Sequence, residues 1–355
     1  MKKIVICLLA VVIFTSTLLT GCGGEVPASS SKSASADLDA SGESAPTLSG
    51  DTVVVRVGHA FQPTHPISIE LDNLAARIEQ NSNGLVKVEV HGAGVLGNNE
   101  QMAQQVLAGS LDAMIAGALD NFSSYDSRAD VEDLPFLFRS EAEAHAALDG
   151  EYGQLIRSDV LAPVGLYVIS FWENGLRHMT NNKHPLYTPA DFKGIKFRSA
   201  VAPMFIKLFE TLDSSAVPIA ATELFTALQQ GTVDGQENPL TNIEAMNLHE
   251  VQKYVTLTGH VYVSSPVVIN HDLWNSYSDE VRNILTTEFT TSRDNERQLN
   301  AEMTEKAVES LQSKGMEFNE LTNHSEFVQA LQPVWDYYIS ENGQSGQALI
   351  DAATK

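Results

Sequence analysis

A glycine pattern is the first feature of the sequence that could carry chemistry. The segment HGAGVLGNNE, residues 91–100, contains Gly-x-Gly-x-x-Gly, the spacing of a dinucleotide-binding turn. In that motif the preceding strand is apolar on both faces, because helices cover both sides of the sheet. Here the strand carries Lys87 and Glu89, and Asp112 begins the next strand instead of ending it. We therefore interpret the glycines as a tight turn whose amides can face a polar ligand, and a nicotinamide or flavin enzyme is disfavoured.

Other patterns for catalysis are weak. The sequence has no phosphate-binding loop, no nucleophile elbow and no His-Glu-x-x-His. Its 10 histidines lack ligand spacing, so we expect neither a metal nor a cofactor. Asp234 or Glu237 could act as the base of an enzyme, but carboxylates in a turn after a helix are more often polar groups of a loop or a ligand cleft. We expect a binding protein, with an enzyme as the less favoured alternative.

Arg198 is the strongest candidate for binding a ligand. It lies one residue before the end of a strand predicted at 195–199 (IKFRS), on the face opposite Ile195 and Phe197. Ligands of open α/β sheets bind beyond the carboxyl ends of the strands. A guanidinium is a planar fork that binds a carboxylate through two charge-assisted hydrogen bonds. The sequence thus allows an anion site here, although an arginine exposed on a strand is the alternative that residue type alone favours.

The elements that would position Arg198 alternate between strand and helix patterns, which predicts an α/β architecture with parallel strands. The strands are expected at 52–59, 85–90, 112–116, 164–171 and 195–199, and the helices at 66–80, 100–107, 140–147, 188–193, 204–212 and 222–230. Another helical run covers 278–314 without glycine or proline, about three times a typical helix. A helix so long is best used to bridge two domains, and about 300 residues exceed the usual size of one core.

The amino terminus predicts export. Residues 1–21 read as a signal peptide, and Leu19-Thr20-Gly21-Cys22 resembles a bacterial lipobox, which predicts lipidation of Cys22. Residues 22–51 are rich in Ser, Ala and Gly and predict a flexible tether. The other cysteine lies in the signal, so the mature chain would have no disulfide. We expect an extracytoplasmic protein held at a membrane by a lipid anchor.

The charge excludes one class of partner. The chain has a formal charge of −23, and removing two signal-peptide lysines leaves −25. Such acidity argues against nucleic acid and against docking on anionic lipid through a basic face. Attachment to a membrane would come from acyl chains.

Four segments together resemble a known family. DFKGIKFR (191–198) followed by ATELFTALQQGTVDGQENP (221–239) is similar to the central signature of the dicarboxylate-binding family, the solute-binding proteins of tripartite ATP-independent periplasmic (TRAP) transporters. NGLRHMTNNKHPL (174–186) and SNGLVKVEVHGAGVLGNNEQ (82–101) match further family segments, and the resemblance extends from Val55 to about Gln344.

The resemblance implies an α/β, two-lobed periplasmic-binding-protein fold of type II-like form. A ligand cleft would lie between the lobes, with a hinge of crossing strands and a long lobe-bridging helix. By the family pattern, lobe one comprises 52–174 and 264–303, and lobe two comprises 175–263 and 304–355.

The resemblance also implies the ligand-binding residues. Arg198 occupies the place of the family's carboxylate-binding arginine, Arg177 matches a second arginine near the carboxylate, and Asn238 matches an asparagine that hydrogen-bonds the ligand. Further contacts are expected from His59, Phe61, Asn98, Trp172 and Tyr262, although for Trp172 and Tyr262 a place in the core is the favoured alternative.

The function implied is capture of a small organic-acid anion and its delivery to a TRAP-type membrane permease. A sensor of the same fold that feeds a signalling partner is the alternative. Dicarboxylates, sugar acids, keto acids and aromatic acids all remain open as ligands.

Overall fold

The computed structural model describes residues 52–355. The predicted signal peptide, Cys22 and the predicted tether lie outside the described residues. Between Thr52 and Lys355 no helix is both long and apolar enough to cross a bilayer.

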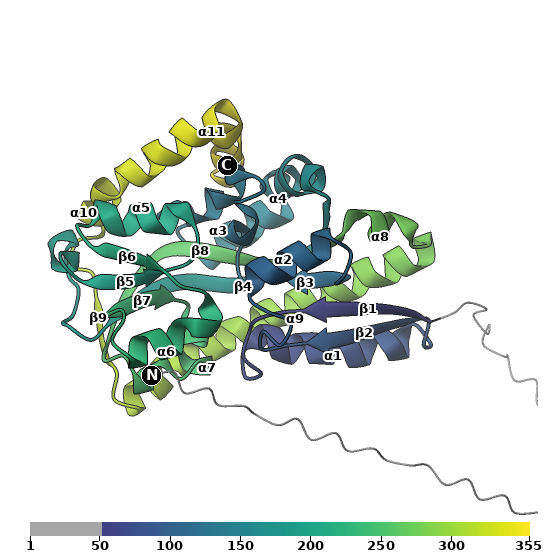
Figure 1. The fold of residues 1–355 in the computed structure, drawn as a ribbon, viewed down its shortest axis with the longest axis horizontal. Helices are drawn as coiled ribbons and strands as arrows, with labels where there is room; N and C mark the ends of the chain where they lie inside the picture. Colours follow the sequence, from purple (N-terminus) through teal and green to yellow (C-terminus); the bar gives the residue numbers. More distant parts are fainter. Residues whose placement is uncertain (1–51) are drawn as a thin grey trace, which may run out of the picture. The chain divides into compact units, whose positions relative to one another are not determined.

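A mixed sheet of nine strands forms the centre of the described chain (Figure 1). The strands follow the order β2-β1-β3-β8-β4-β7-β5-β6, and β9 pairs with β8. Their bounds are β1 Val53–Gly58, β2 Val86–His91, β3 Ala113–Ile115, β4 Leu166–Asn181, β5 Lys196–Ser199, β6 Ser215–Pro218, β7 Gly235–Asn238, β8 Tyr254–Asn270 and β9 Glu317–Glu320.

The expectation of parallel strands is correct at the two ends of the sheet and wrong at its centre. β1 is parallel to β2 and β3, and β5 is parallel to β6 and β7. The long strands β4 and β8, however, are antiparallel to each other, and β3 and β7 pair with them in antiparallel fashion. β4 and β8 are buried along most of their length, so neither shows the alternation that would have revealed its full extent.

The pairing of β4 with β8 is interrupted near its middle. The register shifts between Glu173 and Gly175, where Glu173 lies opposite Ser264 and Gly175 opposite Val263. Gly175 has φ 110°, a conformation that side chains rarely adopt. This bulge coincides with the expected lobe boundaries at 174/175 and 263/264, and the division into lobes itself stays a prediction.

The helices flank the sheet. Their bounds are α1 Pro66–Asn81, α2 Asn99–Leu107, α3 Glu141–Asp149, α4 Glu151–Leu155, α5 Pro203–Thr211, α6 Leu224–Gln229, α7 Leu240–Ala245, α8 His271–Ser276, α9 Asp279–Ser313, α10 His324–Ala330 and α11 Gln332–Ala353. The short helix expected after Thr188 is a single 3₁₀ turn at Pro189–Phe192.

The long helix expected over 278–314 is confirmed as α9. It begins at Ser278, whose side chain accepts a hydrogen bond from the amide of Val281. α9 packs against β4, against α1 and against α7, so it contacts elements of both expected lobes. Its backbone and side chains are tied to β4: the Trp172 Nε1–H donates to the carbonyl of Phe289 at 3.2 Å.

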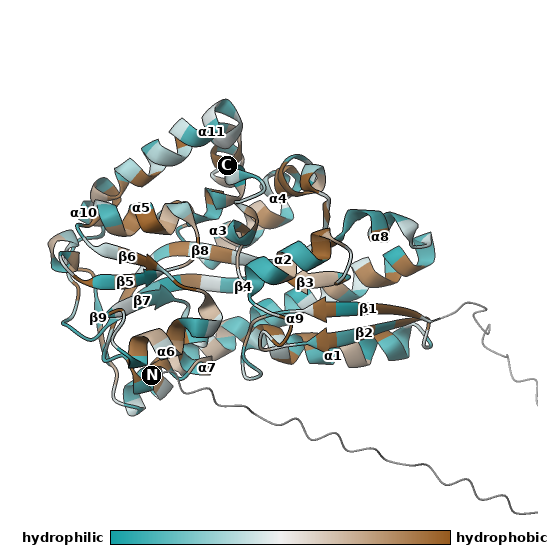
Figure 2. Ribbon diagram, in the orientation of Figure 1, coloured by the Kyte–Doolittle hydropathy of each residue, from teal (hydrophilic) through white to brown (hydrophobic). Residues whose placement is uncertain are grey.

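Hydrophobic residues gather between the sheet and its helices. One core lies between β1, β2, α1 and α9, a larger one is shared by α2 to α5 and α11, and a third joins α6 and α7 to the end of α9. In Figure 2 the strand β1 is mostly hydrophobic, whereas α2 is mainly hydrophilic. One group of polar side chains lies where the carboxyl ends of β1, β3, β5 and β7 meet.

Candidate functional site

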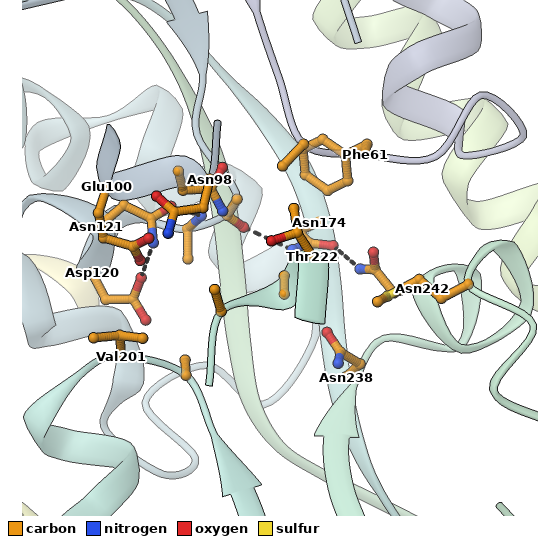
Figure 3. A pocket seen from close by; sticks show the side chains of 18 of the residues that line it. Phe61, Asn98, Glu100, Asp120, Asn121, Asn174, Val201, Thr222, Asn238 and Asn242 are labelled. Atoms are coloured by element: carbon orange, nitrogen blue, oxygen red, sulfur yellow. Dashed lines mark hydrogen bonds between the residues drawn. The ribbon is translucent and has the colours of Figure 1, made fainter. Parts of the chain in front are cut away.

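A cavity lies beyond the carboxyl ends of the short parallel strands (Figure 3). Segments from the whole chain contribute to its wall: the residues after β1, the start of α2, the loop after β3, the middle of β4, the ends of β5 and β7, and α5 and α7. The wall comprises Ala60, Phe61, Gln62, Asn98, Asn99, Glu100, Gly117, Ala118, Asp120, Asn121, Asn174, Arg177, Arg198, Ala200, Val201, Phe205, Ala220, Ala221, Thr222, Asn238, Asn242 and Met246.

Arg198 is buried in this wall with only 4% of its surface exposed, so the alternative of an exposed strand arginine is wrong. Its Nε–H donates to the carbonyl of Ile219 at 2.8 Å, and its two terminal nitrogens have no hydrogen-bond partner within residues 52–355. Burial lowers the pKa of Arg198 to about 10, so the side chain is still a cation at neutral pH. The protein thus holds a fixed positive charge with two donor groups left for a ligand.

Arg177 lies beside it but is already neutralised. Its Nε and Nη2 donate to the carboxylate of Glu237, and Nη2 also donates to the Glu237 carbonyl at 2.8 Å. Burial lowers the pKa of Arg177, but attraction to Glu237 and the hydrogen bonds to it outweigh burial and raise the pKa above its ordinary value. The buried pair has no net charge, and Nη1 has no hydrogen-bond partner among the described residues.

Asn238 is oriented by its neighbours. Its Oδ1 accepts from Nη2 of Arg177 at 3.1 Å, and its Nδ2 donates to Oε1 of Gln236. An amide nitrogen has two hydrogens, so one N–H of Asn238 is available to the cavity.

Two further amides cross the floor of the cavity. Nδ2 of Asn242 donates to Oδ1 of Asn174, and Nδ2 of Asn174 donates to the carbonyl of Gly117 at 2.7 Å. This chain of hydrogen bonds joins α7, β4 and the loop after β3, and therefore links parts of the two expected lobes.

Acidic groups form the opposite wall. Asp120 has 4% of its surface exposed, and one of its carboxylate oxygens accepts from Nδ2 of Asn121 at 3.0 Å. Burial raises the pKa of Asp120 to about 7, with Arg177 and Arg198 opposing the rise and Glu100 and Glu237 adding to it. Glu100, in the first turn of α2, lies near Asp120 in Figure 3 and has no hydrogen-bond or ion-pair partner among the described residues.

More buried acids lie behind Asp120. Burial raises the pKa of Asp130 and of Glu132 to about 7 and that of Asp133 well above its ordinary value. Glu132 is held by Ser264, whose backbone N–H and side-chain O–H both donate to its carboxylate at 2.8 Å. Within residues 52–355, no group of three or more His, Cys, Asp or Glu side chains is arranged to hold a metal ion.

The glycine turn at 92–97 lies next to lining residues of the cavity, although it does not line the cavity itself. Gly94 has φ 70°, and a Cβ there would lie 3.0 Å from Cγ2 of Thr222, which lines the cavity. The backbone after the turn leads into α2, where Asn98 caps the helix by accepting from the amide of Gln101 at 2.9 Å. The turn brings two distant segments close together at the edge of the cavity.

Five of the eight expected ligand-binding residues line the cavity, namely Phe61, Asn98, Arg177, Arg198 and Asn238. The other three do not. Trp172 is fully buried against Phe289, and Tyr262 packs edge-on against Phe138 with ring centroids 5.8 Å apart. His59 lies under the glycine turn, where a Cβ on Gly92 would be 2.8 Å from its ring. The structure gives these three a packing role.

Several lining residues were missed from the sequence. Asp120 and Asn121 follow β3 in a 3₁₀ turn, Leu119–Phe122, which has no recognisable pattern. Asn242 lies on α7, which was not predicted. Asn174 could have been found, because it opens the segment NGLRHMTNNKHPL and precedes the glycine of the bulge.

The two carboxylates considered as a catalytic base, Asp234 and Glu237, do not line the cavity. Glu237 is fully buried and paired with Arg177. Asp234 is 2.9 Å from Nζ of Lys183 and accepts from the amide of Lys196 at 3.1 Å.

The chain is similar to proteins of known families and structures. Residues 57–342 match the model of the family described as bacterial extracellular solute-binding protein, family 7. The 2,3-diketo-L-gulonate-binding periplasmic protein YiaO of Escherichia coli is 31% identical over 83% of this chain and 90% of its own. The C4-dicarboxylate-binding periplasmic protein DctP of Rhodobacter capsulatus is 30% identical over 88% of this chain and 93% of its own.

A solved structure shares the fold. It is a TRAP periplasmic solute-binding protein from Roseobacter denitrificans with bound β-D-glucuronate. It is 25% identical to this chain and covers 85% of it and 99% of its own length, with a TM-score of 0.82.

Proposed function

This chain belongs to bacterial extracellular solute-binding protein family 7, and we propose that it captures a small organic-acid anion in the cavity described above and delivers it to a TRAP-type membrane permease. Relatives bind a diketo sugar acid, a C4-dicarboxylate and a uronate. The common chemistry of those ligands is a carboxylate.

The observation that carries the proposal is the state of Arg198. Its guanidinium is buried, charged and held at Nε by the Ile219 carbonyl, with its terminal nitrogens unpaired in the described chain. A desolvated cation without a partner is costly, and a carboxylate that meets both terminal nitrogens removes the cost. Because the chain is strongly acidic as a whole, affinity has to come from these local donors and not from long-range attraction.

Delivery would depend on closure of the lobes. The hydrogen bonds from Asn242 through Asn174 to Gly117 and the approach of Gly94 to Thr222 join segments from both expected lobes around the cavity. Such contacts between the lobes would hold the closed form over the ligand, and the permease would recognise that closed form.

We also propose that the protein acts outside the cytoplasm and is held at the membrane through lipidated Cys22. The family name supports the first statement, and the lipobox sequence supports the second. The relatives described above are named as binding or solute-binding proteins, so we retain delivery to a permease and not the sensor alternative.

A screen of organic acids by thermal denaturation tests the proposal. A true ligand at a hundredfold its dissociation constant adds about 2.7 kcal/mol to the free energy of unfolding, so the melting temperature should rise. Recovery of that acid unchanged after incubation with the protein would exclude an enzyme. A chain that no carboxylate stabilises would contradict the proposed function.

A further inference from the structure

The cavity contains one cation, Arg198, that forms no ion pair with another side chain of residues 52–355. Arg177 and Arg198 are the only cationic side chains among the residues that line the cavity in the described chain. The charge of Arg177 is compensated by its ion pair with Glu237, so Arg198 is the cation available to a ligand. One ligand carboxylate balances that charge.

Two acidic side chains of the cavity wall, Glu100 and Asp120, would repel a second carboxylate. Glu100 has no partner among the described residues, and Asp120 has one oxygen bonded to Asn121 while the other is unpaired. Figure 3 shows Glu100, Asp120 and Asn121 together on one side of the cavity, with Asn238 and Asn242 on the other. In a partly dry site, two like charges a few ångströms apart repel strongly.

Most of the remaining polar wall consists of side-chain amides. Six besides Asn238 line the cavity: Gln62, Asn98, Asn99, Asn121, Asn174 and Asn242. An amide presents both a donor and an acceptor, and so does each hydroxyl group of a ligand. An unpaired carboxylate such as Glu100 accepts a strong hydrogen bond from a hydroxyl.

We propose that the preferred ligand is a hydroxylated monocarboxylate, a sugar acid of the aldonate or uronate class, whose carboxylate binds Arg198 and whose hydroxyls bind the amides, Glu100 and Asp120. The two acids thereby select against dicarboxylates. This inference rests on the proposed function of the same cavity. The inference goes further than the proposed function, because it names the side chains that bind the part of the ligand beyond its carboxylate.

An amino acid would also satisfy one cation and two acids, but it fits the wall less well. An ammonium group only donates, so it leaves the N–H groups of the amides without acceptors. Unpaired polar groups in a buried site are costly. A ligand rich in hydroxyls can accept hydrogen bonds from the amide N–H groups and donate to the amide oxygens.

A matched series of ligands tests the inference by titration calorimetry on the full chain. The probes are D-gluconate and D-galactonate, their dicarboxylate counterparts D-glucarate and galactarate, D-glucosaminate as the amine, and hexanoate as the acid without hydroxyls. We expect one of the two aldonates to bind at least about tenfold more tightly than its dicarboxylate counterpart and than hexanoate, since each lost or unpaired charged hydrogen bond costs about that factor.

The double variant Glu100→Gln and Asp120→Asn identifies the residues responsible. It should weaken the aldonate and reduce the preference over the dicarboxylate by at least about tenfold, because a second carboxylate no longer meets like charges. Glu305→Gln, an exposed position on α9 away from the cavity, removes one charge as a control and should leave the preference unchanged.

The outcomes separate this inference from the proposed function. A dicarboxylate or D-glucosaminate that binds as tightly as the aldonates, or a double variant with unchanged preference, overturns the inference while Arg198-dependent binding of carboxylates persists. Binding of none of these acids, nor of any other carboxylate, would contradict the proposed function as well.

Discussion

Arg198 and Arg177 show how two arginines of one cavity are given different tasks by their neighbours. Both are buried, yet within residues 52–355 only Arg177 has an acidic partner within hydrogen-bonding distance. The Nε of Arg198 binds a neutral carbonyl, which fixes the orientation of the guanidinium without cancelling its charge. The fork is therefore preorganised for a planar anion.

Replacing Arg198 by lysine should weaken ligand binding by at least about tenfold, because an ammonium cannot form two parallel hydrogen bonds and cannot also retain the bond to Ile219. The variant keeps the charge, so a loss of affinity reports on geometry. Calorimetry with an acid that the wild-type chain binds measures it. An affinity equal to that of the wild type would show that charge alone suffices.

Replacing Glu237 by glutamine should destabilise the chain by about 3 to 5 kcal/mol, because it leaves the cation of Arg177 buried without its counter-ion. Urea denaturation measures the change. Glu317→Gln provides the control, since Glu317 pairs with Lys253 in an exposed bridge 3.1 Å long, and such pairs contribute about 0 to 1 kcal/mol. Equal losses in the two variants would contradict the role given to burial.

At this scale the sequence predicted Arg198 from its place at the end of a strand, whereas Asn238 was expected from the family resemblance alone. The two residues belong to β5 and β7, whose ends meet at the cavity. Trp172 and Asn174 lie only two positions apart on β4, but Trp172 packs against α9 and Asn174 lines the cavity. Residues two positions apart share one face of a regular strand, and the register shift between Glu173 and Gly175 lets these two differ. Since no local pattern predicted that shift, the choice of Trp172 could not have been corrected without the structure.

The bulge in β4 is the element that joins the two halves of the sheet. β4 and β8 run through the whole sheet, and their register changes where Asn174 and Gly175 lie. α9 reinforces the same region, because the Glu296 carboxylate accepts from the amide of Glu173 at 2.9 Å. The hydrogen bonds that hold the cavity floor begin at this bulge.

Replacing Gly175 by alanine should destabilise the chain by more than about 1 kcal/mol, because φ 110° is strained for alanine and the new Cβ would lie 3.3 Å from Nδ2 of Asn300. Gly109→Ala is the matched control: it also has positive φ, 72°, but no neighbour within 4 Å. Thermal denaturation of the two variants separates the effects: Gly109→Ala introduces backbone strain alone, whereas Gly175→Ala introduces backbone strain and a close contact. A loss no larger than that of the control would argue against a tightly packed bulge.

The helices were the most predictable elements. α1, α2, α5 and α9 begin and end within two residues of the expected positions, since their caps and apolar periodicity are local signals. The four-residue strands β6, β7 and β9 were not predicted, because they depend on pairing with distant partners that no local pattern reveals.

The described chain as a whole buries both acidic side chains and histidines. The pKa values of five buried acids are raised in the fold: Asp120, Asp130, Glu132, Asp133 and Glu296. The pKa values of three buried histidines, His59, His65 and His260, and of the half-buried His178 are lowered. Burial is the largest cause for each of these groups.

These shifts predict a pH dependence of stability. An acid whose pKa is raised in the folded state, such as Asp120, stabilises the fold at a pH below its unfolded pKa. That contribution is lost as the pH rises through the folded pKa, which is about 7 for Asp120. A buried neutral histidine destabilises the fold as pH falls below about 6.5, where the unfolded chain takes up a proton. The free energy of unfolding should therefore rise by about 1 to 3 kcal/mol from pH 8 to 6.5 and then level off.

Urea denaturation across that range measures the effect. Asp133→Asn, which places a neutral group at a buried position, should raise the stability at pH 8 and reduce the slope. A free energy of unfolding that falls from pH 8 to 6.5 would contradict the direction assigned to the buried acids.

The central claim, that a carboxylate binds the uncompensated charge of Arg198, is tested most directly by titration calorimetry of Arg198→Ala beside the wild type. The ligand is the organic acid that most stabilises the wild-type chain. Truncating one member of a buried charge pair costs about 2 to 5 kcal/mol, so binding should weaken roughly 30- to several-thousand-fold. An unchanged dissociation constant would contradict the account.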